Sequence, residues 1–125
     1  MTGILAIDTA TDACSVALHD AGETREIYEV IPREHSRRLF GMLQRLLPSG
    51  HLREQGIAAI AYSCGPGSFT GLRICASAVQ GLAYTNALPA IAISTLALQA
   101  QTALRLGHVT ASDTVLSTID ARISD

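Results

Sequence analysis

The sequence Gly65-Pro66-Gly67-Ser68-Phe69-Thr70-Gly71-Leu72-Arg73 decides the fold, because it joins a short apolar segment, residues 57–62, to a long run of small and apolar residues, 74–86. Its glycines can adopt positive φ or admit a second backbone at close range, and Pro66 fixes one φ. A hydroxyl from Ser68 or Thr70 can cap the helix that follows. The stretch therefore predicts a strand, a tight turn and a helix.

The function of this junction has two possible interpretations. The start of a helix directs backbone N–H groups and a positive dipole end at one place, which is how proteins hold phosphate or another anion. The other reading is a tight turn without a ligand. The Gly-Lys-Ser/Thr ending of a P-loop is missing, and the chain contains no lysine.

Composition indicates one soluble domain. The chain has 125 residues, of which 48% are hydrophobic and 16% charged, and its net charge is −2. All nine positive residues are arginines and they are scattered, so we expect no direct, tight RNA binding by this chain alone. Three widely spaced cysteines predict reduced thiols, with Cys64 and Cys75 buried. The start of the chain and its apolar runs predict a cytoplasmic protein with no membrane partner.

Alternation and turn signals predict the sheet. Three extended segments, residues 3–8, 14–18 and 25–31, are joined by short turns, which favours an antiparallel meander. A fourth strand, 58–63, arrives after a helix and should pair in parallel through that crossover. Residues 89–93 are expected to form a further short strand.

Three helices are expected. The first, residues 34–47, is amphipathic, with His35, Leu39, Met42, Leu43 and Leu46 on one side. The second, 69–85, leaves almost no polar face, so it should be covered both by the sheet and by a helix or another protein. The third begins at Ser94 or Thr95 and ends near 105.

The final segment, residues 114–120, is apolar and ends in an acid, which repeats the pattern of residues 4–8. It is predicted to be a strand. We therefore expect residues 1–110 to form an N-terminal lobe and 111–125 to begin a second, truncated lobe, so that the chain is a fragment or an unusually short version.

Four sequence motifs in this order carry a family resemblance. They are Ile-Leu-Ala-Ile-Asp-Thr-Ala-Thr at 4–11, Cys-Ser-Val-Ala-Leu at 14–18, His-Ser-Arg-Arg-Leu at 35–39 and the stretch at 65–73. The chain resembles the TsaB (YeaZ) family, which is related to TsaD/Kae1. Ile119-Asp120-Ala121-Arg122 is similar to the opening of the second lobe in that family. The resemblance implies an α/β, actin-like ATPase (ribonuclease H-like) lobe with a mixed sheet and flanking helices.

The resemblance also implies a function. It points to a non-catalytic scaffold that is required for threonylcarbamoylation of the adenosine beside the anticodon, in tRNAs that read codons starting with A. The implied partners are TsaD, as a heterodimer, the ATPase TsaE and a second copy of the chain, with tRNA contacted only indirectly. The helices from His35 and Leu72 are the predicted partner surface. Its residues are His35, Leu39, Met42, Leu43, Leu46, Leu72, Cys75, Ala76 and Val79.

The alternative is an enzyme of the actin-like superfamily that binds or hydrolyses a nucleotide. The residues expected for that role are Asp8, Thr9, Gly65, Gly67 and Ser68. ATP or ADP with Mg would then sit at a complex interface, and the chain by itself would need no cofactor. The His-x-x-x-His pair of TsaD-type metal sites is absent, so no metal site and no catalytic residue are predicted. A peptidase is disfavoured, because Ser68 lacks the Gly-x-Ser-x-Gly elbow.

Overall fold

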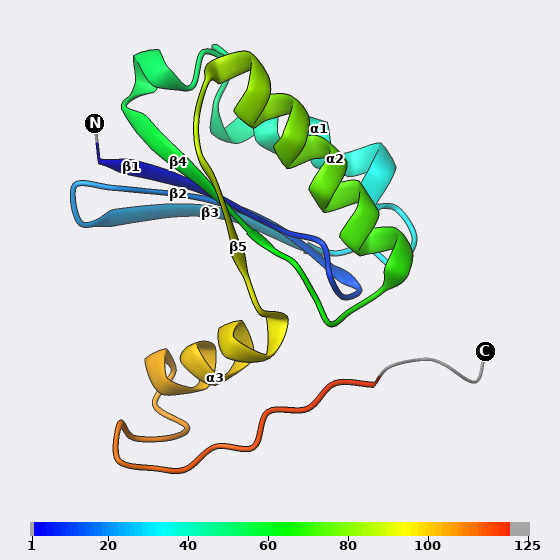
Figure 1. Ribbon diagram of the computed structural model, residues 1–125, viewed down its shortest axis with the longest axis vertical. Helices are drawn as coiled ribbons and strands as arrows, with labels where there is room; N and C mark the ends of the chain where they lie inside the picture. Colours follow the sequence, from blue (N-terminus) through cyan, green and yellow to red (C-terminus); the bar gives the residue numbers. More distant parts are fainter. Residues whose placement is uncertain (1, 121–125) are drawn as a thin grey trace.

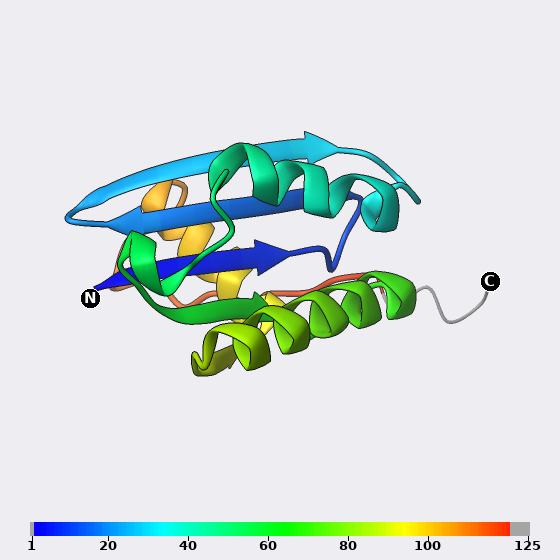
Figure 2. The same cartoon turned by 90° about the horizontal axis from the view of Figure 1, so that it is seen from above.

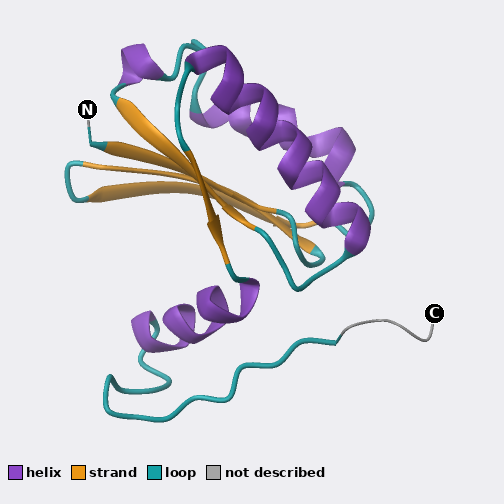
Figure 3. Cartoon of the chain, viewed as in Figure 1, coloured by secondary structure: helices purple, strands orange, loops and turns teal. Residues whose placement is uncertain are grey.

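The computed structural model describes residues 2–120. In chain order its elements are β1 (Gly3–Asp8), β2 (Ala13–Asp20), β3 (Glu23–Val30), α1 (His35–Leu46), a short 3-10 helix (Arg53–Gln55), β4 (Ile57–Ser63), α2 (Phe69–Asn86), β5 (Ala90–Ile93) and α3 (Thr95–Arg105). Figures 1 and 3 show their arrangement. Each strand and helix predicted up to residue 105 is present, with bounds that differ by one or two residues in most cases.

The strands form one mixed sheet in the order β3-β2-β1-β4-β5. β2 pairs antiparallel with both β1 and β3, which confirms the meander. β4 pairs parallel with β1 and with β5, which confirms the crossover through α1. Leu5 therefore faces Leu18 on one side and Ile60 on the other, so apolar side chains line up across three strands.

The two faces of the sheet are covered differently. α1 and α2 lie over one face, and α3 lies on the opposite side (Figures 1 and 2). Period-2 alternation sends Leu5 and Ile7 toward α1 and α2, while Ile4, Ala6 and Asp8 point to the other face. The core lies under α1 and α2, where the largest fully buried side chains include Leu5, Ile7, Leu39, Met42, Ile57 and Ile60.

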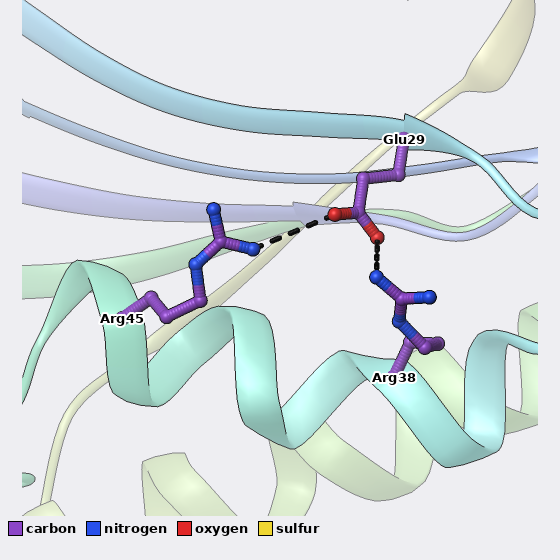
Figure 4. Close-up of polar contacts among 3 residues, drawn as sticks. All are labelled: Glu29, Arg38 and Arg45. Atoms are coloured by element: carbon purple, nitrogen blue, oxygen red, sulfur yellow. Dashed lines mark hydrogen bonds and ion pairs between the residues drawn. The ribbon is translucent and has the colours of Figure 1, made fainter.

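Glu29 of β3 fixes α1 against the sheet. Its carboxylate oxygens lie 2.6 Å from Nη2 of Arg38 and 3.5 Å from Nη1 of Arg45, as Figure 4 shows. The two arginines stand two turns apart on one side of α1, so a single carboxylate holds the helix at two points.

The strand predicted at 114–120 is wrong, because this segment has no strand conformation. A strand needs a neighbour that accepts its backbone hydrogen bonds, and residues 114–120 pair with no strand. The segment lies beside α3 instead, where the Ser117 hydroxyl donates to the Leu96 carbonyl at 2.9 Å. The second lobe remains a prediction, and residues 121–125 of that prediction lie outside the described part.

Candidate functional site

Asp8 ends β1 beside the end of the parallel strand β4. Its Oδ1 accepts hydrogen bonds from the Ala10 backbone N–H at 3.0 Å and from the Ser63 hydroxyl at 2.8 Å. The carboxyl ends of adjacent parallel strands are where α/β sheets commonly place ligands. Asp8 is half-buried, and one of its carboxylate oxygens is already used to shape the β1–β2 turn.

The glycine-rich loop packs directly on that turn. A Cβ at Gly67 would lie 2.6 Å from the Ala10 carbonyl oxygen, and one at Gly71 would overlap the carbonyl of Thr9. Both positions therefore require glycine because two backbones meet there. The Ser68 N–H donates to the Ala10 carbonyl at 2.8 Å, and the Thr9 hydroxyl donates to the Gly71 carbonyl at 2.6 Å.

The loop therefore docks α2 on the β1–β2 turn. Ser68 caps α2, as predicted, since its Oγ accepts the Gly71 N–H and its carbonyl accepts the Leu72 N–H. Several of the N–H groups that an anion would need already have protein acceptors. Gly65 lies at φ +115° and its carbonyl accepts the Thr95 N–H, so it connects the loop to the start of α3.

The structure thus brings the five predicted nucleotide-binding residues to one corner of the sheet, but it gives several of them a packing role. Thr9 is fully buried and its hydroxyl is bonded inside the protein, whereas Asp8 keeps partial exposure. Nucleotide or magnesium binding remains a prediction. The sequence shows that the loop is rich in glycine. It does not show whether the glycines allow a second backbone to approach closely or whether they bind an anion.

A polar cleft of about 690 Å3 opens where α1 and α2 both begin. Its walls include Thr11 and Asp12 of the β1–β2 turn, Arg33, Ser36 and Thr70. This cleft could not be predicted from the sequence, because its lining comes from three separate segments. Arg33 at this cleft is a residue other than glycine that lies at φ +63°, which the sequence does not reveal.

The predicted partner residues on α1 lie in the core. His35, Leu39, Met42, Leu43 and Leu46 are all buried, and Cys75 and Val79 of α2 are buried as well. Their apolar periodicity therefore reports packing on the sheet, although His35, Leu39 and Leu43 also border hollows on the surface. Partner contact at these positions remains a prediction. The other two of the nine predicted partner positions are more accessible, because Leu72 is half-buried and Ala76 is exposed.

The outward surface of the same two helices carries large aromatic side chains. Phe40, Phe69 and Tyr84 are 58%, 73% and 87% exposed. Arg73, Ser77 and Gln80 are also exposed, so the prediction that α2 has almost no polar face is wrong. Helical periodicity in the sequence identified the apolar positions of α1 and α2, but it did not show which side of each helix faces solvent.

Two hollows lie between α1 and α2 on this surface. A groove of about 450 Å3 is lined by Leu39, Phe40, Arg73, Ile74 and Ser77 among others. An apolar pocket of about 230 Å3, lined by residues that include Phe40, Leu43, Leu47 and Leu82, lies at the far end of the helices. We call the outward surface of α1 and α2, with these two hollows, the helical face.

Two thiols and one imidazole in this region are buried. Burial, followed by the charges of Glu29 and Asp8, raises the pKa of Cys14 to about 11, and burial also raises the pKa of Cys75. His35 lies 3.2 Å from the Ala13 carbonyl through Nε2, so this nitrogen carries the hydrogen. Cys64 is exposed, contrary to prediction, because it follows the last residue of β4, where the chain leaves the sheet.

Within residues 2–120, no three histidine, cysteine or carboxylate side chains come together as a metal site would require. None of the helices in that range combines the length and apolarity needed to cross a bilayer.

Comparison with known proteins identifies relatives. Residues 25–124 match the family TsaD, tRNA N6-adenosine threonylcarbamoyltransferase. The chain is 48% identical over 122 residues to the tRNA threonylcarbamoyladenosine biosynthesis protein TsaB of Escherichia coli, which covers 98% of this chain and 52% of that protein. It is also 35% identical over 97 residues to the tRNA N6-adenosine threonylcarbamoyltransferase of Bordetella avium, covering 74% of this chain and 28% of the relative.

Among solved structures, YeaZ from Pseudomonas aeruginosa superposes with a TM-score of 0.75 at 47% identity, over 86% of this chain and 51% of that one. RuvC of T. thermophilus, bound to a Holliday junction, superposes with a TM-score of 0.51 at 15% identity, over 83% of this chain and 70% of that one. This second likeness shows the fold alone. Together with the family match it confirms the actin-like, ribonuclease H-like architecture. The chain spans about half the length of the TsaB relatives it matches.

Proposed function

Because the chain belongs to the TsaD family and is similar to its TsaB (YeaZ) members over nearly its whole length, we propose that it serves tRNA threonylcarbamoyladenosine biosynthesis as a non-catalytic subunit. In this role it binds a TsaD-type transferase through the helical face and leaves the transfer chemistry to that partner. Assembly with TsaE, pairing with a second copy and action in the cytoplasm belong to the same proposal.

One observation carries the proposal beyond the family likeness. The glycine-rich loop is used to seat α2 on the β1–β2 turn, through the Ser68 N–H and the Thr9 hydroxyl. With α2 seated in this way, Phe69 and Tyr84 are exposed at opposite ends of α2, and Phe40 of α1 is exposed as well. Exposed aromatic side chains beside apolar hollows are the usual anchors of a protein–protein interface.

A charge on the exposed surface of α2 tests the scaffold role. Ala76→Glu places a carboxylate on the helical face without disturbing the core, since Ala76 is exposed. We expect it to abolish co-elution with the transferase of the same organism and to lower tRNA threonylcarbamoylation. Ala97→Glu is the matched control, because Ala97 is an exposed alanine on α3, on the other side of the sheet. Unchanged co-elution of Ala76→Glu would contradict the proposal.

A second candidate, a nucleotide-binding enzyme, is favoured by Asp8 at the end of β1 and by the polar cleft at the starts of α1 and α2. Isothermal titration of ATP with Mg2+ against the purified chain separates the two candidates. The scaffold role predicts weak or no binding. Binding in the micromolar range that Asp8→Asn abolishes would favour the enzyme.

A further inference from the structure

The polar cleft of about 690 Å3 lies where the chain enters α1 and α2. Both helices begin at the same end of the sheet, beside the ends of β1 and β3 (Figure 2). The walls of the cleft come from the β1–β2 turn, from the loop between β3 and α1, and from the first residues of the two helices. Proteins bind small molecules in cavities of about 300–1,000 Å3, so the cleft has room for a ligand of nucleotide size.

Two helices direct the positive ends of their dipoles at this cleft. Ser36 and Thr70 are the second residues of α1 and α2, and both residues line the cleft. Their backbone N–H groups donate to no acceptor within residues 2–120, as expected for the first turn of a helix. Free N–H groups at a helix start are the usual protein donors to phosphate. The cleft therefore offers such donors from two sides.

The charges around the cleft favour an anion. Arg33 lies in the lining and takes part in none of the ion pairs within residues 2–120. Asp12, also in the lining, opposes it with one negative charge, whereas the neighbouring Glu34 is paired with Arg37 at 3.3 Å. Each helix start adds roughly half a positive charge, so the sum over Arg33, Asp12 and the two helix starts is about +1. The cleft is thus locally positive on a chain of net charge −2.

His35 gives the cleft a hydrogen-bond acceptor beside these donors. The residue lines the cleft and is only 6% exposed. Its Nε2 lies 3.2 Å from the Ala13 carbonyl, and its Nδ1 has no hydrogen-bond partner within residues 2–120. Because Nε2 carries the hydrogen, Nδ1 has an open lone pair. A polar atom on a nearly buried side chain needs a partner, which water or a hydroxyl group of a ligand in the cleft supplies.

We propose that the polar cleft binds a small phosphorylated ligand that also carries hydroxyl groups, either a sugar phosphate or a nucleotide. The phosphate lies between the starts of α1 and α2, where it accepts hydrogen bonds from their free N–H groups and from Arg33. A ligand hydroxyl donates to Nδ1 of His35. Of the five nucleotide-binding residues expected from the sequence, only Ser68 lines this cleft, so the two sites are different. The proposal depends neither on a metal ion nor on a transferase partner.

Isothermal titration of the purified chain with ribose 5-phosphate, ribose and AMP tests the site. The titrations contain EDTA, which removes the magnesium that a nucleotide site at Asp8 would use. We expect ribose 5-phosphate to bind at least about tenfold more tightly than ribose, because ribose lacks the charged acceptor. Tighter binding of AMP than of ribose 5-phosphate would assign the cleft to a nucleotide, and equal or weaker binding to a sugar phosphate. Failure of both phosphorylated probes to bind, or equal affinity for ribose and ribose 5-phosphate, overturns the proposal.

Three variants locate the bound phosphate. Arg33→Asn removes the guanidinium and keeps a residue that tolerates the left-handed backbone at φ +63°, so the affinity for the phosphorylated probe should fall about tenfold. Asp12→Asn removes the opposing charge and should raise the affinity about threefold, a gain that misfolding does not produce. Arg105→Asn, the control at an exposed residue of α3, should leave the affinity unchanged. Unchanged affinity in Arg33→Asn would place the phosphate elsewhere and overturn the proposal.

Discussion

Replacing Gly71 with alanine should destabilise the protein, although alanine is normally the better helix residue. In an exposed helix interior, glycine to alanine stabilises by about 0.5–1 kcal/mol. At position 71 the new Cβ would overlap the Thr9 carbonyl oxygen. Thr9 is fully buried and cannot move aside without disturbing the end of β1, so α2 must retreat from the turn.

The size of the loss in folding free energy can be estimated from the hydrogen bonds that break when α2 moves away from the β1–β2 turn. The hydrogen bonds from the Thr9 hydroxyl to the Gly71 carbonyl at 2.6 Å and from the Ser68 N–H to the Ala10 carbonyl at 2.8 Å would both lengthen. Each contributes about 1 kcal/mol, and overpacking at a tight contact costs a further 1–3 kcal/mol or so. After the gain in helix propensity, we expect a net loss of about 2–4 kcal/mol, a large share of the roughly 5–15 kcal/mol typical of a domain.

Gly81 provides the matched control, because it lies in the same helix and a Cβ there would meet nothing within 4 Å. Urea unfolding followed by circular dichroism gives the free energy of unfolding of Gly71→Ala and Gly81→Ala. We expect the first variant to lose stability and the second to gain about 0.5–1 kcal/mol. Equal stability of the two variants would refute the docking role of the glycine-rich loop.

Three further changes have expected outcomes. Thr9→Val keeps the buried shape but removes the donor to the Gly71 carbonyl, so the urea midpoint should fall by an amount equivalent to about 1 kcal/mol; an unchanged midpoint would show that this bond adds nothing. Glu29→Gln removes the charge that holds Arg38 and Arg45, both of which are largely exposed. It should therefore cost only about 0.5 kcal/mol at low salt, and the difference from the original protein should vanish in 1 M salt. Cys14 has a pKa of about 11 in the folded chain against 9.0 for an ordinary thiol, so its contribution to stability is complete below pH 9 and is lost as the pH rises through 11. The free energy of unfolding should fall by about 1.4 kcal/mol per pH unit in that window. Cys14→Ala should make this slope shallower and leave the part that comes from Cys75, whose pKa is raised by burial as well, whereas Cys64→Ala, at an exposed thiol, serves as the control; equal slopes in Cys14→Ala and the original protein would contradict the assignment.

Part of the site could be predicted from local pattern and part could not. Ser68 as a helix cap and the glycines at 67 and 71 follow from spacing within a few residues. Whether those glycines hold an anion or a neighbouring backbone depends on the β1–β2 turn, which lies more than fifty residues away in the sequence. The polar cleft depends on similarly distant segments, and no local pattern reports it.

The sequence by itself determined the order and type of the elements, because alternation, helical periodicity and capping act over a few residues. It also determined the meander and the parallel crossover, since short turns and a helical connection allow little else. Only the tertiary structure decided which side of each helix is exposed. Leu39 and Val79 lie in the core, and Phe40 and Tyr84 face outward, because burial depends on the sheet and not on the helix alone. The conformation of residues 114–120 also depended on the tertiary structure, because a strand forms only where another strand accepts its hydrogen bonds.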